Sequence, residues 1–437
     1  MKLSLRGQNK NGMIKSMINP QTLKGFRDFL PVEARKRQYV IDILKKVFES
    51  YGFEPLETPA LEYEEILLGK YGDEGDKLMY RFEDNGMRKV ALRYDQTVPL
   101  ARVVAQYGSA SSPQGQNLLP MPFKRYQIQN VWRAENTQKG RFREFLQCDI
   151  DTVGTSSPLA DAEIIEIAAT SLKNLGFKDF KILINDRENL KFKTNGIALS
   201  PDRNILAVRA IDKLKKIGKD GVLKELQENK FTREEAEEIL QVVGNTELSP
   251  RLSEIFSILK QLGVTDNQYE FSPTLARGMN YYTGTIFEIE IEGYSAGSVC
   301  GGGRYDNLIG MFANKQVPAV GCAFGFDRLM EAMDELNLFP TDLTITKVLV
   351  TIFSPELLDK SIEVCGILNK NNINQELYID PNAKLERQLK YADQKGIPYC
   401  VIIGPDEAKS NTVTVKNLKT REQKNLPLDQ LSDLFKE

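Results

Sequence analysis

The stretch that decides the fold reads TLARGMNYYTGTIFEIE and covers residues 274–290. Its second half, residues 286–291, alternates apolar and acidic side chains, which predicts a half-buried strand. Its first half contains two glycines and displays Arg277 beside Tyr281 and Tyr282. A guanidinium next to phenol hydroxyls suits a site that binds a phosphate or carboxylate together with a small polar ring. Taken alone, the same pattern also fits a surface hairpin with an ion-paired arginine.

The composition limits the possible classes of protein. A chain of 437 residues is long enough for two to four domains. The net charge of −2 provides no overall basic field for nucleic acid, so any RNA binding must use local patches. Five cysteines without a CxxC spacing predict reduced thiols in a cytoplasmic protein. The N-terminus lacks the apolar region of a signal peptide, and no apolar run is long enough to span a membrane.

The chain contains no histidine. Serine–histidine and cysteine–histidine nucleophile pairs are therefore excluded, as are an imidazole base and a histidine-ligated zinc ion. Any catalysis must use arginine, carboxylate, tyrosine, bound metal or backbone groups.

Changes in pattern along the chain predict five segments. An N-terminal extension (1–20) precedes a β-rich region (21–192), which is interrupted by a Lys/Glu-rich helical insertion (193–262). The β-rich pattern then returns (263–342) and is followed by a regular alternation of strands and helices (346–437). Such alternation is typical of a separate α/β domain.

Residues 89–97 predict a strand that follows an Asn-Gly hairpin turn. On such a strand Asp95 and Thr97 would share one face, because side chains alternate with a period of two. A carboxylate and a hydroxyl placed together are suited to bind an ammonium group, although a polar strand end is the plainer interpretation.

Residues 126–151 predict two antiparallel strands joined by a basic loop. Arg133, Arg141 and Arg143 are many cations for one hairpin, and Phe145 offers a face on which a base could stack. Because several acids lie nearby, a solvated ladder of ion pairs is the alternative.

These arginines, with Arg277 and with Arg328 in the first turn of a predicted helix, suit a nucleotide bound on an open antiparallel sheet. The sequence has neither a P-loop nor a Rossmann glycine pattern. Attack of a carboxylate on the α-phosphate of ATP needs no imidazole, because the nucleophile is already anionic at neutral pH. Catalysis then depends on positioning and on neutralising charge at phosphorus, which two arginines and Mg²⁺ could supply.

Three segments resemble motifs 2 and 3 of class II aminoacyl-tRNA synthetases: WRAE (132–135), GRFREF (140–145) and GFDR (325–328). The run LARGMNYYTG (275–284) resembles the signature of the histidyl-tRNA synthetase family. The resemblance extends from about Gly25 to the end of the chain. It implies an α+β fold, in which helices flank an antiparallel catalytic sheet formed by both β-rich regions. The insertion is then a helical domain, and the C-terminal α/β domain binds the anticodon.

The resemblance also implies an activity. A member of this family activates L-histidine to histidyl-adenylate with ATP and Mg²⁺, without a metal held by the protein, and transfers the histidyl group to the 3′ end of tRNA(His). It acts as a cytoplasmic homodimer without a membrane partner, and the helix from Pro31 would then lie at the dimer interface. The alternative is a synthetase-like, histidine-binding regulatory subunit of ATP phosphoribosyltransferase.

Individual roles follow from the resemblance, position by position. It assigns the catalytic role to Arg133 and Arg277, on opposite sides of the α-phosphate. For ATP it implies Arg133, Glu135, Arg141, Arg143, Phe145 and Arg328. For histidine it implies Asp95, Thr97, Arg133, Gln147, Asp151, Arg277, Tyr281 and Tyr282, with Asp151 and Tyr282 at the two imidazole nitrogens. Gln138 and Lys139 would reach the tRNA acceptor end.

Two positions depart from the family pattern. Asn280 stands where an aspartate is usual, and Gln96 replaces an apolar residue. Either change could alter packing around the pocket, but neither removes a proposed ligand.

Overall fold

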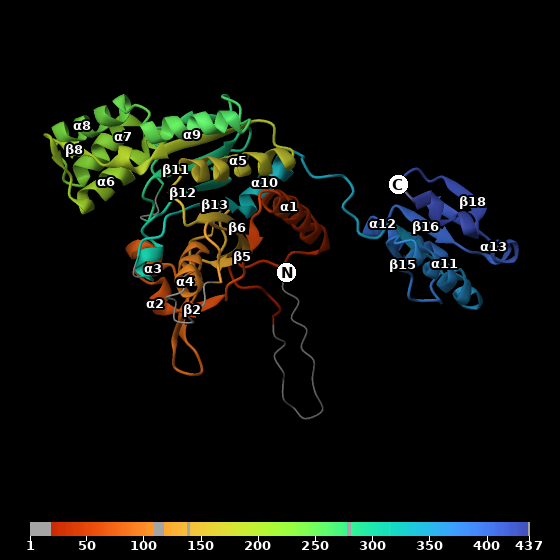
Figure 1. Cartoon of the computed structure of the whole chain (residues 1–437). Coiled ribbons are helices and arrows are strands. Elements are labelled where there is room, and N and C mark those ends of the chain that lie inside the picture. Colours follow the sequence, from red (N-terminus) through yellow and green to blue (C-terminus); the bar gives the residue numbers. More distant parts are fainter. Residues whose placement is uncertain (1–18, 109–117, 138–139, 278–280, 314, 436–437) are drawn as a thin grey trace, which may run out of the picture. The chain divides into compact units, whose positions relative to one another are not determined.

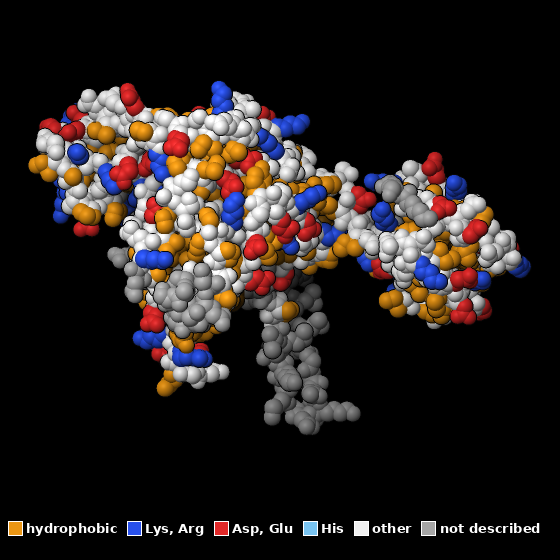
Figure 2. All heavy atoms as spheres, viewed as in Figure 1, with side chains coloured by type: hydrophobic (Ala, Val, Ile, Leu, Met, Phe, Trp, Pro, Cys, Tyr) orange, Lys and Arg blue, Asp and Glu red, His pale blue; other side chains and the backbone are white. Residues whose placement is uncertain are grey.

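The computed structural model describes residues 19–108, 118–137, 140–277, 281–313 and 315–435, with only the backbone at 72–74 (Figure 1). The chain forms two compact units, Met1–Phe339 and Pro340–Glu437. Acidic and basic side chains are interspersed over the face shown in Figure 2, in keeping with the small net charge. No helix in the described ranges is long and apolar enough to cross a membrane.

The first unit is built on an eight-stranded sheet. In spatial order its strands are β1 (Glu54–Pro55), β5 (Phe123–Trp132), β6 (Glu144–Val153), β13 (Ala319–Gly325), β12 (Cys300–Arg304), β11 (Thr285–Ile291), β7 (Phe180–Asp186) and β10 (Tyr269–Phe271). Neighbours from β5 to β7 are antiparallel, as predicted, whereas the short edge strands β1 and β10 pair in parallel.

Helices cover one face of this sheet. They are α1 (Pro31–Ser50), α5 (Pro158–Asn174), α9 (Pro250–Gln261) and α10 (Phe326–Glu335). Figure 1 shows α5 and α9 side by side along the strands, and they contact each other directly. The alternation predicted for residues 286–291 is present, because Phe287 and Ile289 point into the core beneath these helices.

A second hydrophobic cluster lies on the other face of the sheet, where Leu183 and Ile286 pack with three helices. These are α6 (Pro201–Asp212), α7 (Leu214–Glu228) and α8 (Arg233–Asn245), which follow the short strands β8 (Lys193–Thr194) and β9 (Ile197–Ala198). Residues 232–235 have the sequence pattern of a capping box, and at the start of α8 Thr232 and Glu235 exchange hydrogen bonds of 2.8 and 3.2 Å. We propose residues 193–262 as the inserted domain, although α9 at its end packs into the main core.

Smaller elements complete the first unit. The sheet β2 (Leu61–Tyr63), β4 (Lys89–Leu92) and β3 (Arg81–Glu83) lies near α2 (Glu64–Leu67), α3 (Gly72–Lys77) and α4 (Thr97–Tyr107). The prediction of one strand through residue 97 is wrong, because β4 ends at Leu92 and Thr97 begins α4. The physical reason is local, since the Asp95 carboxylate accepts a 3.1 Å hydrogen bond from the Val98 N–H in the first turn of α4.

The second unit is an α/β domain with the strand order β15 (Gln375–Leu377), β14 (Val348–Val350), β16 (Tyr399–Ile402), β17 (Thr412–Asn417) and β18 (Gln423–Pro427). Its first three strands are parallel and its last two are antiparallel. The helices are α11 (Leu358–Lys370), α12 (Leu385–Lys395) and α13 (Pro405–Ser410). Its core is formed by its own apolar residues, such as Val350, Leu368 and Val415.

Candidate functional site

A cavity of about 300 Å³ opens on the sheet face opposite α5 and α10. On β6, Gln147, Asp149 and Asp151 face the cavity and alternate with the core residues Cys148 and Ile150. The cavity is lined by these residues named in the sequence analysis: Asp95, Thr97, Arg133, Glu135, Arg141, Phe145, Gln147, Asp151, Arg277, Tyr281, Tyr282 and Arg328. Segments that are far apart in the sequence therefore meet in one place.

Some expected site residues lie elsewhere. Arg143 does not line the cavity, because its Nε donates to the Glu135 carbonyl (3.1 Å) and its side chain packs against Gly25. Gln138, Lys139 and Asn280 lie outside the residues that the structure describes.

The carboxylate of Asp151 is held by two side chains that the sequence analysis did not assign. Arg125 Nη2 lies 2.7 Å from Asp151 Oδ2, and the Tyr305 hydroxyl donates to Oδ1. Burial raises the pKa of Asp151, while the Arg125 guanidinium opposes that shift. Both partners are almost fully buried. Nothing in the local sequence indicated them, because Tyr305 is 154 residues away from Asp151.

A second carboxylate lies between the β5–β6 hairpin and α4. Asp95 Oδ1 accepts a 2.8 Å hydrogen bond from the Tyr71 hydroxyl, and Oδ2 has no hydrogen-bond partner among the described residues. Thr97 lies beside it at the start of α4. Burial raises the pKa of Asp95, and the hydrogen bonds from Val98 and Tyr71 counteract the shift.

Three arginines enter the cavity from three different elements. Arg133, just after β5, donates from Nε to the Tyr94 carbonyl (3.0 Å), and its guanidinium lies 5.2 Å from the Phe145 ring centre. Arg277, in the segment between β10 and β11, donates from Nη1 to the Phe287 carbonyl (3.0 Å). Arg328, in the first turn of α10, donates from Nη1 to the Ser298 carbonyl (3.0 Å). A guanidinium has five N–H donors, so each can still bind a phosphate or carboxylate oxygen.

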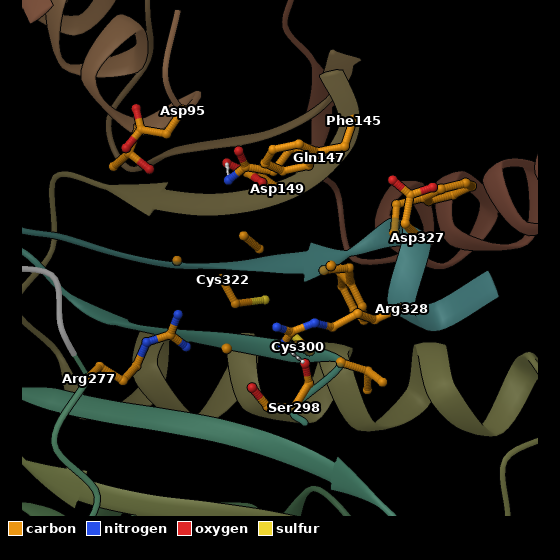
Figure 3. Close-up of a pocket in the computed structure, with 18 of the residues that line it drawn as sticks. Asp95, Phe145, Gln147, Asp149, Arg277, Ser298, Cys300, Cys322, Asp327 and Arg328 are labelled. Atoms are coloured by element: carbon orange, nitrogen blue, oxygen red, sulfur yellow. Dashed lines mark hydrogen bonds between the residues drawn. The ribbon is translucent and has the colours of Figure 1, made fainter. Parts of the chain in front are cut away.

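Glycines on β12 and β13 form the floor between the carboxylates and the arginines. A Cβ atom on Gly301 would lie 1.6 Å from Arg277 Nη1, and one on Gly321 would lie 1.9 Å from Asp151 Oδ1. Because glycine has no Cβ, Gly301 allows the Arg277 guanidinium to lie against the backbone of β12. In Figure 3, Asp95, Gln147 and Asp149 lie on one side of the cavity, with Arg277 and Arg328 on the other.

The cavity thus has two chemically different sides. The acidic side can accept hydrogen bonds from an ammonium group or a protonated ring nitrogen. The arginine side can bind the oxygens of phosphates and carboxylates. No group of three Cys, Asp or Glu side chains among the described residues is arranged to hold a metal ion.

Comparison with known proteins gives full-length matches. The family model described as histidyl-tRNA synthetase matches residues 25–329, and one described as anticodon binding domain matches residues 347–437. A histidine–tRNA ligase from Cytophaga hutchinsonii is 40% identical over 95% of this chain and 99% of its own length. One from Gloeobacter violaceus is 40% identical over 95% and 98%.

Solved structures agree with these matches. A histidyl-tRNA synthetase from Nostoc sp. PCC 7120 is 32% identical, with a TM-score of 0.81, and covers 95% of this chain and 99% of that one. A protein from Bacillus halodurans, described as an ATP phosphoribosyltransferase regulatory subunit/histidyl-tRNA synthetase, has a TM-score of 0.67 at 22% identity. It covers 85% of this chain and 96% of its own, and at that identity the likeness concerns the fold alone.

Proposed function

The chain belongs to the histidyl-tRNA synthetase family, and we propose that the cavity on β6, β13 and β12 is where it joins L-histidine to ATP. The chain is a histidine–tRNA ligase with the predicted class II α+β fold, and relatives of the same activity align with it from end to end. One observation carries the assignment to this cavity: Asp149 and Asp151 on β6 face Arg277 across a floor of glycines on β13 and β12, while Arg133 enters from the end of β5.

We propose that the histidine carboxylate attacks the α-phosphorus of ATP between Arg133 and Arg277. A carboxylate O–P bond forms, the bond to the bridging oxygen breaks, and pyrophosphate leaves with that electron pair. No proton is transferred in this step, so a chain without histidine can carry it out. Each guanidinium neutralises charge that grows on the phosphoryl oxygens, and such donors typically contribute roughly 10²–10³-fold to kcat.

The remaining ATP contacts are assigned to the residues near Phe145. We propose that Glu135 and Phe145 bind the adenine and that Arg141 and Arg328 bind the phosphate chain, where Mg²⁺ would accompany the triphosphate. Arg143 then acts by holding the chain after β5 against Gly25 rather than by touching ATP.

The imidazole of histidine is assigned to Asp151 and Tyr282, with Tyr281 lining the pocket. Arg125 and the Tyr305 hydroxyl favour the ionised form of Asp151, which can then accept a hydrogen bond from a ring N–H. The Tyr282 hydroxyl can donate to the other ring nitrogen. An amino acid without both groups would leave buried polar atoms unpaired, which gives discrimination without an editing step.

The α-ammonium group is assigned to Asp95, Thr97 and Gln147. Asp95 Oδ2 and Gln147 Oε1 are both buried and lack hydrogen-bond partners in the described part of the chain. Buried acceptors of this kind are costly unless a ligand pairs with them. An ammonium group, which has three N–H donors and no acceptor, is a fitting partner.

We further propose that residues 347–437 bind the anticodon of tRNA(His), that Gln138 and Lys139 reach its acceptor end, and that the enzyme works as a cytoplasmic homodimer. The buried face of α1, with Val40, Leu44 and Phe48, packs within its own unit. A dimer surface fits better at the groove beside β2 and β4, where Leu61, Tyr63 and Leu118 are exposed.

The regulatory-subunit alternative is not favoured, since the curated relatives that match at 38–40% identity are histidine–tRNA ligases. The experiment that tests the site assignment is ATP–pyrophosphate exchange with each of the twenty amino acids, using the wild type and Arg277→Ala. Exchange with histidine alone, reduced roughly 10²–10³-fold in the variant, supports the proposal. Histidine binding without exchange in the wild type would contradict it.

A further inference from the structure

Asp149 is a buried carboxylate in the cavity to which the family resemblance gives no role. It is 2% exposed and lies on β6 between Gln147 and Asp151. Its Oδ2 accepts a 3.2 Å hydrogen bond from Gln147 Nε2, which Figure 3 shows as a dashed line. Its Oδ1 is buried and has no hydrogen-bond partner within the described ranges. A carboxylate in such a position is costly to bury, so its presence calls for a reason.

The hydrogen bond between Gln147 and Asp149 fixes the direction of the amide. An ionised carboxylate can only accept, so the NH₂ end of Gln147 must face it. The carbonyl oxygen, Gln147 Oε1, is then turned away from Asp149 and left without a partner in this part of the structure. In the reversed orientation the amide oxygen would lie against the carboxylate, and the NH₂ group would face any cation in the pocket. Both contacts are repulsive.

The backbone around this pair is also fixed. The backbone carbonyl oxygen of Gln147 accepts a 3.2 Å hydrogen bond from Gln96 Nε2, which also donates to the backbone carbonyl oxygen of Gln129 (2.8 Å). Opposite Asp149 on β13 is Ala323, which has no polar side-chain group. Opposite it on β5 is Gln127, whose amide is already bonded to Thr58, Gln129 and Arg125. The side chain that Asp149 can order is therefore Gln147.

We propose that Asp149 is a positioning residue for recognition of the α-ammonium group of histidine: it holds the side-chain oxygen Gln147 Oε1 toward the ammonium. This inference rests on the proposed function, in which histidine occupies this cavity. Asp149 acts through Gln147 and does not bind the imidazole, which belongs to Asp151 at the next position on the same strand face.

The test uses the full-length enzyme and three ligands that differ in one group each. L-Histidine has an ammonium, a carboxylate and an imidazole; L-histidinol lacks the carboxylate; 3-(imidazol-4-yl)propanoate lacks the ammonium. In the variant Asp149→Asn we expect calorimetric Kd values for histidine and histidinol to rise roughly 10–100-fold, because a hydrogen bond to a charged group is lost. The Kd of the propanoate should change less than threefold, and the KM for ATP should be unchanged.

Two further variants test whether Asp149 acts on histidine binding through Gln147. Gln147→Met keeps the length of the side chain and removes the amide, so adding Asp149→Asn to it should weaken histidine binding less than threefold further. Asp149→Ala, which removes the acceptor without adding a donor, should reproduce the ligand pattern of Asp149→Asn. Thermal midpoints no lower than that of the wild type, together with unchanged ATP binding, would show that the variants are folded.

The binding data distinguish failure of the inference from failure of the proposed function. Equal weakening of all three ligands would assign Asp149 to the imidazole or to general packing and overturn the inference, as would unchanged binding of histidine. If the wild type fails to bind histidine, the proposed function itself fails, and the inference with it. If the wild type binds histidine and exchanges pyrophosphate while Asp149→Asn behaves like it, only the inference fails.

Discussion

Gly301→Ala should inactivate the enzyme by moving Arg277 while leaving the fold intact. Gly301 lies in β12, and its backbone conformation is one that alanine can adopt without strain. The added Cβ would lie 1.6 Å from Nη1 and 2.7 Å from Cζ of Arg277. To regain a normal contact of about 3.5 Å, the guanidinium must retreat by roughly 2 Å. That movement breaks its 3.0 Å hydrogen bond to the Phe287 carbonyl.

The expected magnitude follows from the role proposed for Arg277. A misplacement of about 1 Å in a positioned catalytic group can cost roughly 10²-fold, and loss of a transition-state donor costs roughly 10²–10³-fold. We therefore expect kcat for histidine-dependent pyrophosphate exchange to fall at least about 10²-fold, close to the value for Arg277→Ala. Histidine binding measured without ATP should change less, because Asp151 and Arg125 lie on β6 and β5.

The matched control is Gly244→Ala. Gly244 lies in α8, and a Cβ atom there would meet nothing within 4 Å. Alanine is favoured over glycine in a helix, so this variant should be as stable as the wild type or more so, with unchanged exchange. The double variant Gly301→Ala with Arg277→Ala should be no slower than Arg277→Ala alone. If Gly301→Ala exchanges within threefold of the wild type, or if the two effects multiply, the position assigned to Arg277 is wrong.

Three further changes test the charges and contacts around the cavity. Burial raises the pKa of Asp149 well above its usual value, so the carboxyl ionises less readily in the folded state than in the unfolded state, and stability falls as the pH rises from about 4 through the raised pKa. Asp149→Asn should therefore raise the thermal midpoint at pH 7, and the gain should disappear as the pH is lowered toward 4 in calorimetric scans. Arg125→Leu should destabilise the protein by about 3–5 kcal/mol in urea unfolding, because it leaves the Asp151 carboxylate buried without its cation, and adding Asp151→Asn should restore part of the loss. Phe142 lines the cavity, and the Arg27 guanidinium lies 3.2 Å from its ring centre. Because Arg27 holds this ring in place, Arg27→Ala should raise the KM for ATP roughly fivefold to thirtyfold and leave histidine binding unchanged. Equal weakening of ATP and histidine binding would refute a role specific to ATP.

The sequence was informative wherever a local pattern determines the structure. The hairpin of residues 126–151 was predicted because both strands alternate and a basic loop separates them, and β5 and β6 pair there. The helix expected from Pro31 is α1, which begins at that residue, and a proline in the first turn is a local signal for a helix start. Such signals concern neighbours in the chain, which a single sequence reports directly.

One error is local: residues 89–97 were predicted to be one strand, although the Asp95 side chain accepts a hydrogen bond from Val98 in the first turn of α4. The other errors and omissions have a common physical cause. Arg125 and Tyr305 were not assigned, because their role is to hold Asp151 across the fold. Arg143 was placed with ATP, although its partner Gly25 lies more than 100 residues earlier in the chain. In each case a tertiary contact, which has no local signature, decided the outcome.

The order of the strands explains how a chain without histidine can bind and activate this amino acid. The carboxylates stand on β6, the arginine side begins at β11, and the strands between them, β13 and β12, offer mainly glycine and alanine to the cavity. The width of these two strands therefore keeps Asp149 and Asp151 apart from Arg277, and the space between them stays open. A substrate with a cationic end and a carboxylate can lie across that floor with each end at its complementary side. The carboxylate then meets the α-phosphate where the arginines are, and the step needs no base.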